Sequence, residues 1–265
     1  MNTYFELESA FSSGYFEHQF DTSTSSLLLN HFNELAPNGI LRAGMNLGNT
    51  LFTRQDNSGQ LHGVSVDLMA ELAKRLGVPL EFVTFAQPGQ VADASTKDAW
   101  DVAILAIEKT RAQTISFSPA MTEIEAGYVV HQNSVLLLTE HVDAKGVKIA
   151  AQEKAGYELF LTGSLKNASI VRTPNFPRSM EIFNEKKVDA LAGLKPNLIE
   201  SMHMLQDAKL LDGKFMTVNH GFALPLGREA ANAYLQNFVK ELISSGFISR
   251  SIETHQIKGL TAIKE

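Results

Sequence analysis

The chain has 265 residues, of which 44% are hydrophobic and 20% charged, a balance typical of globular proteins with a packed core. A net charge of −6 and the lack of any Lys and Arg cluster argue against a nucleic-acid partner, because phosphate binding needs a concentrated basic surface. The absence of cysteine excludes disulfides, thiolate catalysis and cysteine-based metal sites.

The first residues are rich in Ser, Thr, Phe and acids without periodicity, and they predict an N-terminal tail over residues 1–26. Their longest apolar run, residues 27–29, is shorter than the ~7–15 residues of a secretory signal core. No run in the chain approaches the ~20 residues of a membrane span. We therefore expect no export signal in the chain as written and no insertion into a membrane. A short helix is expected at residues 26–35.

Short apolar strands then alternate with amphipathic helices. The pattern predicts strands at residues 40–45, 80–85 and 102–107, and helices at residues 66–76 and 89–97. Gly77 is expected to cap the first of these helices. Two extended pieces should flank a turn at residues 56–59. The strand at 102–107 is uninterruptedly apolar, which is typical of a strand covered on both faces.

The pattern restarts after an extended segment at residues 128–131. Strands are predicted at residues 147–151, 169–172 and 188–194, with helices at residues 156–165 and 178–187. Pro196 is expected in the first turn of a further helix. An extended segment at 215–224 and a long helix at 228–245 follow. Two successive βαβ sets imply two parallel-type sheets.

The second set is already a complete unit, so we expect the last segments to return to the first. This predicts a discontinuous first lobe of residues 27–129 and 217–265, and an inserted second lobe of residues 130–216. Two crossing strands would form the hinge. Ligand clefts in such α/β architectures lie at the carboxyl ends of strands and between domains.

Three segments in order carry a resemblance to a known family. Residues 59–68 resemble the "Gly-x-x-x-Gly-Phe-x-x-Asp-Leu" signature of family 3 extracellular solute-binding proteins, the polar-amino-acid receptors of ABC importers. Residues 100–104 resemble the family's "x-D-A-I-I" strand. Arg111 with residues 117–119 resembles its "T-x-x-R…F-S-x-P-Y" segment. The resemblance covers residues 38–255 and implies an α/β, two-lobed type II periplasmic-binding-protein fold with a two-strand hinge.

Arg111 is the leading candidate for a ligand contact. It follows the apolar strand, near Ala106, and a guanidinium pairs bidentately with a carboxylate or phosphate. The alternative is a surface arginine at the start of a helix, in a salt bridge to Glu108. The family usually carries Thr where Glu108 stands. This carboxylate could therefore neutralise Arg111, contact a ligand amine or hydroxyl, or remain exposed.

Further candidates surround Arg111 in the expected cleft. Asn46 and Asn49 follow the first strand, where loops meet the cleft, although asparagines at such positions more often serve as turn residues. Phe52 stands where the family often places an aromatic near the ligand, although core packing is an equal alternative. The family's Gly-Ser/Thr-Thr turn corresponds to residues 152–157. The resemblance therefore implies that the backbone amides of Ala155, Gly156 and Tyr157 face an anion at a helix N-terminus, or else form a plain helix start.

The largest departure from the family concerns the ligand ammonium. Amino-acid-binding members carry an Asp about five residues after the Asp of a "V-D-A" segment, and counting from Asp189 reaches Leu194. A buried ammonium without a partner has a heavy desolvation cost. Unless Glu108 or another acid substitutes, the ligand is expected to be a non-amino carboxylate or another small polar anion. Lys195 would be a second positive contact.

The predicted function is the binding of a small carboxylate-bearing solute, amino-acid-like or another organic anion, for an ABC-type importer. The partners would be the importer's membrane subunits, and no enzymatic activity, cofactor or metal site is expected. The eight histidines have no metal-binding spacing, and no phosphate-binding loop is present. The family implies a periplasmic location, whereas the lack of a signal segment favours the cytoplasm.

Two alternatives remain open. The first is an enzyme on the same fold, a lyase similar to cyclohexadienyl or prephenate dehydratases, with Glu108 or Glu153 as the cleft acid. The second is a cytoplasmic small-molecule sensor module.

Overall fold

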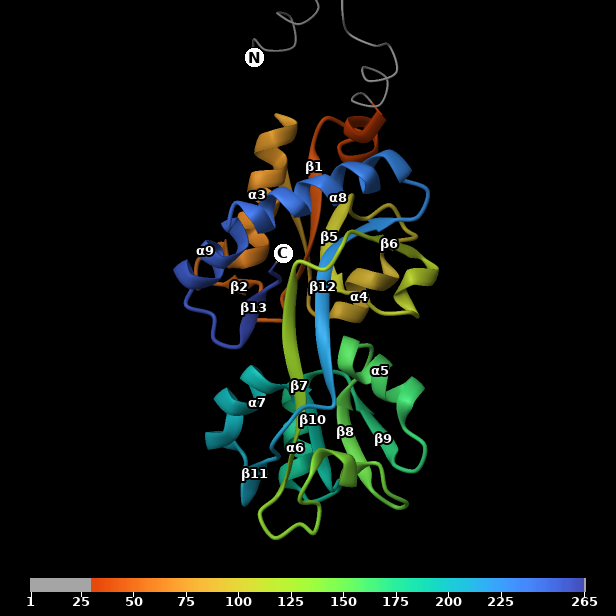
Figure 1. The fold of residues 1–265 in the computed structure, drawn as a ribbon, viewed down its shortest axis with the longest axis vertical. Helices are drawn as coiled ribbons and strands as arrows, with labels where there is room; N and C mark the ends of the chain where they lie inside the picture. The colour runs from red at the N-terminus through yellow and green to blue at the C-terminus, as the bar shows by residue number, and fades with distance from the viewer. Residues whose placement is uncertain (1–29, 265) are drawn as a thin grey trace, which may run out of the picture.

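The computed structural model describes residues 30–264, which form two lobes, one above the other in Figure 1. The predicted tail and the start of the predicted first helix lie outside the described residues, while residues 30–35 are helical. No helix in the described part of the chain is long and apolar enough to cross a membrane.

The first lobe is built on three parallel strands in the order β4-β1-β5. They are β1 (Leu41–Asn46), β4 (Leu80–Phe85) and β5 (Val102–Ala106). All five residues of β5 are buried, as the apolar run predicted. The helices α3 (Val64–Leu76) and α4 (Pro88–Asp93) connect these strands. Gly77 ends α3 in the left-handed conformation, which confirms the predicted cap.

The second lobe repeats this arrangement with parallel strands in the order β10-β8-β9. They are β8 (Lys148–Gln152), β9 (Ser169–Thr173) and β10 (Ala190–Leu194), and the helices are α5 (Gly156–Ser164), α6 (Phe176–Asn184) and α7 (Lys195–Ser201). The α6 helix starts two residues earlier than predicted. The Asn175 side chain accepts a hydrogen bond from the Arg178 amide, which caps α6 there.

Two ten-residue strands, β7 (Thr122–His131) and β12 (Met216–Pro225), run through both lobes. They pair antiparallel with each other. In addition, β12 pairs with β5 in the first lobe and β7 pairs with β10 in the second. Both predicted parallel sets are present, but they do not form two sheets. One continuous ladder, β4-β1-β5-β12-β7-β10-β8-β9, joins both sets because the crossing strands are long enough to pair with each.

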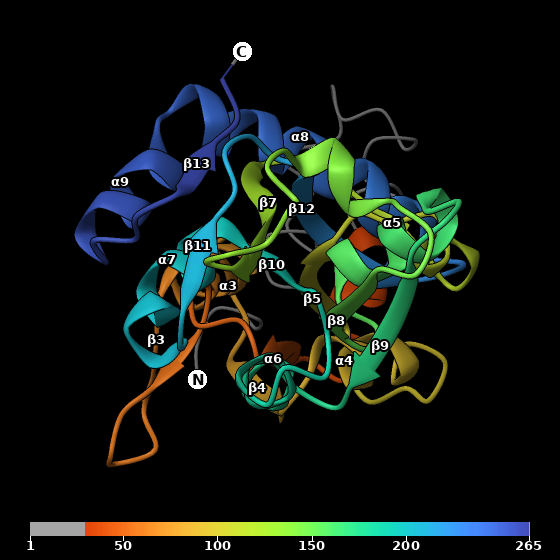
Figure 2. The same cartoon turned by 90° about the horizontal axis from the view of Figure 1, so that it is seen from below.

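Several shorter elements complete the chain. The hairpin of β2 (Arg54–Gln55) and β3 (Leu61–His62) flanks the predicted turn at residues 56–59. The edge pieces β6 (Ile115–Phe117), β11 (Ala208–Leu210) and β13 (Leu260–Ala262) pair with the crossing strands. The helices α8 (Glu229–Ser244) and α9 (Phe247–Thr254) belong to the first lobe. Seen from below, α9 and β13 lie on the opposite side of the molecule from β9 (Figure 2).

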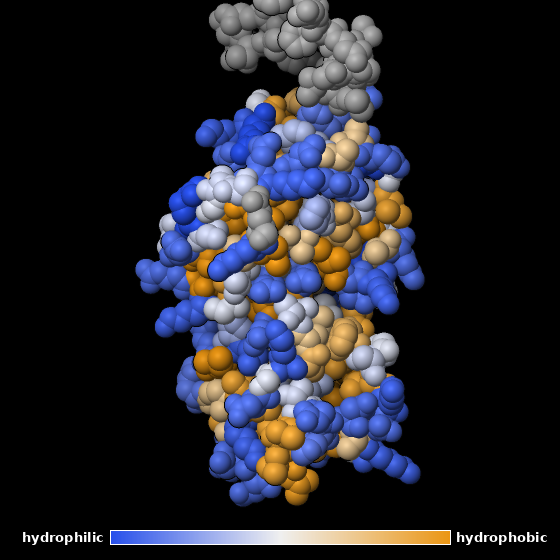
Figure 3. Space-filling model, in the orientation of Figure 1, coloured by the Kyte–Doolittle hydropathy of each residue, from blue (hydrophilic) through white to orange (hydrophobic). Residues whose placement is uncertain are grey.

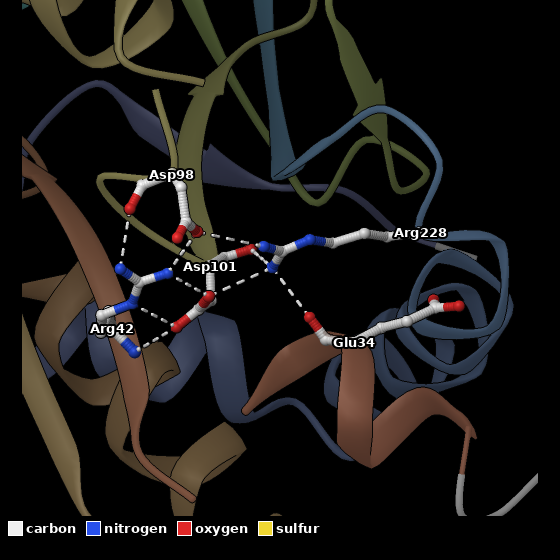
Figure 4. Close-up of polar contacts among 5 residues, drawn as sticks. All are labelled: Glu34, Arg42, Asp98, Asp101 and Arg228. Atoms are coloured by element: carbon white, nitrogen blue, oxygen red, sulfur yellow. Dashed lines mark hydrogen bonds and ion pairs between the residues drawn. The ribbon is translucent and has the colours of Figure 1, made fainter. Parts of the chain in front are cut away.

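A buried charge cluster holds the sequence-distant parts of the first lobe together (Figure 4). Asp101, which precedes β5, is fully buried. Its two carboxylate oxygens accept hydrogen bonds from Nε and Nη2 of Arg42 in β1, at 3.0 and 2.8 Å. Arg228, which precedes α8, donates through Nη1 to Asp101 Oδ1 at 3.3 Å and to the Glu34 carbonyl at 2.8 Å. The cluster therefore ties residues 30–35, β1, β5 and α8 to one another.

The face of the molecule drawn in Figure 3 is mostly hydrophilic, with apolar patches that include its lower end. The loop after β7 exposes three large apolar side chains: Val135, Leu137 and Leu138 are 86, 61 and 46% exposed.

Candidate ligand-binding site

A cavity of about 50 Å³ lies between the lobes, where β1, β5 and β12 of the first lobe meet α5 and α7 of the second. Most of the predicted ligand contacts line it: Asn46, Asn49, Phe52, Ala106, Arg111, Ala155, Gly156, Tyr157 and Leu194. The wall also contains polar residues that were not among the predicted contacts: Thr53, Ser65, Gln152, Asn197 and His220. The structure therefore brings together segments that are far apart in the sequence.

Arg111 begins the short 3-10 helix η1 (Arg111–Gln113), and its side chain is only 5% exposed. Nη1 donates to the Ala106 carbonyl at 3.0 Å, and Nη2 donates to the Lys154 carbonyl at 2.9 Å. Nε is buried without a hydrogen-bond partner. Burial lowers the pKa of Arg111 to about 10, and the charges of Glu108 and Asp93 act in the opposite direction. Burial thus acts against the charged form, which a bound anion would stabilise.

The alternative of an exposed arginine in a salt bridge to Glu108 is wrong. Arg111 is buried, and no carboxylate of the described residues lies within ion-pair distance of it. Instead, Glu108 Oε2 accepts a hydrogen bond from the Thr110 amide at 2.7 Å. Glu108 does not line the cavity, so the prediction that it contacts the ligand is wrong for this closed structure.

The start of α5 closes the cavity from the second lobe. A Cβ atom on Gly156 would lie 2.7 Å from the Cβ of Ala106, so only glycine permits this close approach of α5 to the end of β5. Ala155 is the N-cap residue, and Glu158 accepts a hydrogen bond from the Lys154 amide at 2.9 Å. The helix N-terminus therefore lies against the cavity, where its free N–H groups favour an anion.

Leu194 and Lys195 are adjacent in sequence but point to different places. Leu194 is the last residue of β10 and lines the cavity. Lys195 lines a separate hollow, where its Nζ lies 3.0 Å from a carboxylate oxygen of Glu125. Lys214 also pairs with Glu125 at 3.0 Å. The predicted second positive contact is therefore not placed at the cavity.

His220 and Asn197 are functional candidates that the sequence pattern does not reveal. Asn197 lies in the first turn of α7 and His220 lies in β12, directly opposite Ala106 of β5. Asn197 Oδ1 and His220 Nδ1 are both buried without a hydrogen-bond partner. Burial, together with the nearby charge of Arg111, lowers the pKa of His220 to about 3. The imidazole is consequently neutral near pH 7.

Three polar contacts connect the lobes around the cavity. Besides the Arg111–Lys154 hydrogen bond, Lys154 Nζ lies 2.6 Å from a carboxylate oxygen of Asp93. The side chains of Gln87 and Gln152 are hydrogen-bonded to each other. Together with the close approach at Gly156, these contacts show that the lobes are closed on each other in this structure.

No Asp or Glu of the described residues lines the cavity. Glu108 and Glu153, the two acids considered for a lyase, do not line it. Within residues 30–264, no group of three His, Asp or Glu side chains is placed to hold a metal ion.

Comparison with known proteins identifies the fold and the family. Residues 41–256 match the family described as bacterial extracellular solute-binding proteins, family 3. A comparison with curated protein sequences gave no match.

Three solved structures illustrate the likeness. An ancestral amino acid-binding protein, a precursor of cyclohexadienyl dehydratase, is 21% identical over 85% of this chain and 98% of its own, with a TM-score of 0.70. The cysteine-binding protein of Campylobacter jejuni is 16% identical over 89% and 100%, with a TM-score of 0.73. Holo ArgBP of T. maritima is 20% identical over 82% and 98%, with a TM-score of 0.67. These likenesses establish the two-lobed type II periplasmic-binding-protein fold.

Proposed function

Because the chain belongs to the family 3 bacterial extracellular solute-binding proteins, we propose that it closes around a small carboxylate-bearing solute and presents it to an ABC-type importer. The observation that supports a carboxylate on the ligand is the buried guanidinium of Arg111, which lines the cavity without an acidic partner. We propose the matching lobe division: the first lobe consists of residues 27–129 and 217–265, the second consists of residues 130–216, and the two close on the solute.

The donors of Arg111 fit a carboxylate. Of its five N–H groups, two donate to the carbonyls of Ala106 and Lys154, and the Nε–H has no partner. A carboxylate beside Nε would therefore find unused donors in a site from which most water is excluded. Charge-assisted bonds of this kind are roughly twice as strong as neutral ones. The amides at the start of α5 would contact the same anion from the opposite lobe.

Closure of the two lobes on each other is the proposed mechanism of solute binding. The lobes are joined by β7 and β12, and small dihedral changes in such crossing strands open and close the cleft. The cavity of about 50 Å³ is far smaller than the ~300–1,000 Å³ of most ligand pockets, so the solute enters when the lobes separate. The remaining walls orient it: Phe52 gives an apolar face, and Asn46 and Asn49 shape the loop through bonds to the amides of Gly48 and Leu51.

The membrane subunits of the importer are the proposed partner. The exposed apolar side chains of the loop after β7 offer a contact surface on the second lobe. A lyase function is not favoured, because Glu108 and Glu153 lie outside the cavity that would hold the substrate.

A thermal-shift panel of carboxylates, amino acids and phosphates tests the proposal. A ligand present at a hundred times its Kd stabilises the folded state by about 2.7 kcal/mol, which raises the Tm by about 5–10 °C. We expect this response for carboxylates with the natural chain and with Arg178→Ala, which removes an exposed arginine of α6. Arg111→Ala should show no response. An equal Tm rise in Arg111→Ala would contradict the carboxylate clamp.

A further inference from the structure

The cavity has an unusual charge content for a pocket that would receive a zwitterion. Among the described residues that line it, Arg111 is the only charged one, and none is Asp or Glu. His220 is held neutral by its burial. A ligand therefore meets one positive charge and otherwise neutral groups.

Three acids near the cleft are paired with cations elsewhere. Asp93 pairs with Lys154 at 2.6 Å, and Glu125 pairs with both Lys195 and Lys214. Glu158 is buried in an ion pair of 2.8 Å with Arg172. None of these carboxylates lines the cavity, so none offers an ammonium group a partner there.

Two neutral side chains in the cavity wall instead have unused hydrogen-bonding capacity. His220 Nδ1 and Asn197 Oδ1 are buried without partners, and His220 is only 5% exposed. Leaving such an atom unsatisfied costs about 1–3 kcal/mol, so a ligand group that bonds to it is favoured. A neutral imidazole has one donor and one acceptor nitrogen, and an amide offers both roles.

His220, with its unpartnered Nδ1, lies near Arg111, which is the proposed carboxylate contact. His220 pairs across the ladder with Ala106, whose carbonyl accepts the hydrogen bond from Nη1 of Arg111. A ligand whose carboxylate contacts Arg111 therefore has its adjacent substituent close to His220. A hydroxyl can donate to Asn197 Oδ1 and can either donate to or accept from His220 Nδ1, whereas an oxo group cannot donate to Asn197 Oδ1. An ammonium group could donate to these atoms, but no carboxylate lines the cavity to balance its charge, and the nearby guanidinium would repel it.

We infer that the solute carries a hydroxyl group beside its carboxylate in place of an ammonium group, which makes it a small 2-hydroxy carboxylic acid. This inference rests on the proposed function, in which Arg111 receives the carboxylate. Asn197 and His220 are its specificity-determining residues, since they contact the group that distinguishes a hydroxy acid from an amino acid.

Calorimetric titration with matched pairs tests the inference on the full chain. The pairs differ only in hydroxyl against ammonium: glycolate and glycine, lactate and alanine, 2-hydroxyglutarate and glutamate, phenyllactate and phenylalanine. In at least one pair the hydroxy acid should bind tenfold or more tightly than its amino counterpart. Amino acids that bind as tightly as their hydroxy counterparts would overturn the inference and leave the carboxylate proposal standing. Binding of none of these compounds, with a thermal shift from another carboxylate, would overturn the inference alone, and no thermal shift from any carboxylate would overturn both.

Two substitutions at Leu194 separate an effect of charge on ligand preference from an effect of misfolding. Leu194 is the N-cap residue of α7 and lines the cavity, and both Asp and Asn are favoured N-caps. Leu194→Asp adds a carboxylate to the wall and should shift the preference at least tenfold towards the amino acid. Leu194→Asn should keep the preference for the hydroxy acid. An unchanged ratio in Leu194→Asp would show that wall charge does not decide the ligand class and would overturn the inference.

Discussion

Nη2 of Arg111 donates a hydrogen bond of 2.9 Å to the main-chain carbonyl of Lys154, so the second lobe holds a side chain that belongs to the first. Lys154 adopts a left-handed conformation, with φ of 58°, directly before Ala155, the N-cap residue of α5. Its side chain also reaches Asp93 across the cleft. Because one residue links the lobes through both its main chain and its side chain, the orientation of Arg111 depends on lobe closure, and we expect ligand binding and closure to be coupled.

Arg111→Lys should weaken carboxylate binding without abolishing it. Lysine keeps the positive charge but cannot form two parallel hydrogen bonds with a carboxylate. We expect the Kd for the carboxylate with the largest thermal shift to rise about tenfold, equal to about 1.4 kcal/mol. Titration calorimetry measures it, with Arg178→Lys as the control on an exposed arginine. An unchanged Kd would show that the two parallel hydrogen bonds of the Arg111 guanidinium do not contribute to carboxylate affinity.

Gly156→Ala should hold the lobes apart. The added Cβ would lie 2.7 Å from the Ala106 Cβ, and both atoms belong to packed main-chain positions that cannot easily yield. Overpacking of this kind costs about 1–3 kcal/mol in the closed arrangement. Small-angle X-ray scattering should show a larger radius of gyration. Gly163→Ala in the same helix meets no atom within 4 Å and should leave the radius unchanged; equal radii for both variants would contradict the contact.

His220 should make the protein less stable in mild acid. Its pKa is lowered from 6.5 to about 3 in the folded state, so between these values the unfolded chain binds a proton that the folded chain does not. Stability attributable to His220 is therefore complete above pH 6.5 and decreases as the pH falls towards 3.

His220→Gln removes this titration, so urea unfolding between pH 4 and 7 should show a shallower loss of stability, by about 1 kcal/mol per pH unit. His203→Gln, at an exposed histidine, should keep the natural slope. A natural slope in His220→Gln would mean that His220 is not buried as a neutral group.

Asp101→Asn should destabilise the first lobe and leave ligand binding intact. Asp101 is fully buried between Arg42 and Arg228, and removal of one member of a buried ion cluster costs about 3 kcal/mol. Urea unfolding measures the loss. Asp98→Asn is the matched control, because Asp98 binds the same two arginines but is 76% exposed, and its loss should be much smaller. Equal losses would indicate that burial does not set the strength of the cluster.

Much of the fold could be predicted because its signals are local. The β4 strand has the predicted bounds, and α3, α5 and α8 differ from their predicted ends by no more than two residues. The predicted helix at residues 89–97 ends early, at Asp93. A turn follows, and in it Asp98 adopts a positive φ of 49°.

Short edge strands such as β6, β11 and β13 were not predicted, because their pairing partners in the crossing strands lie far away in the sequence. Three residues carry too little periodicity to reveal a strand by themselves.

The sequence by itself determined the alternating elements, the family and the position of Arg111 after a buried strand. Only the tertiary structure decided that Lys195 pairs with Glu125 outside the cavity, that Glu108 leaves Arg111 without an ion pair, and that His220 lies beside it. The physical reason is that a side chain's partners, burial and charge state depend on segments brought together across the chain. A residue's type and its immediate neighbours do not specify them.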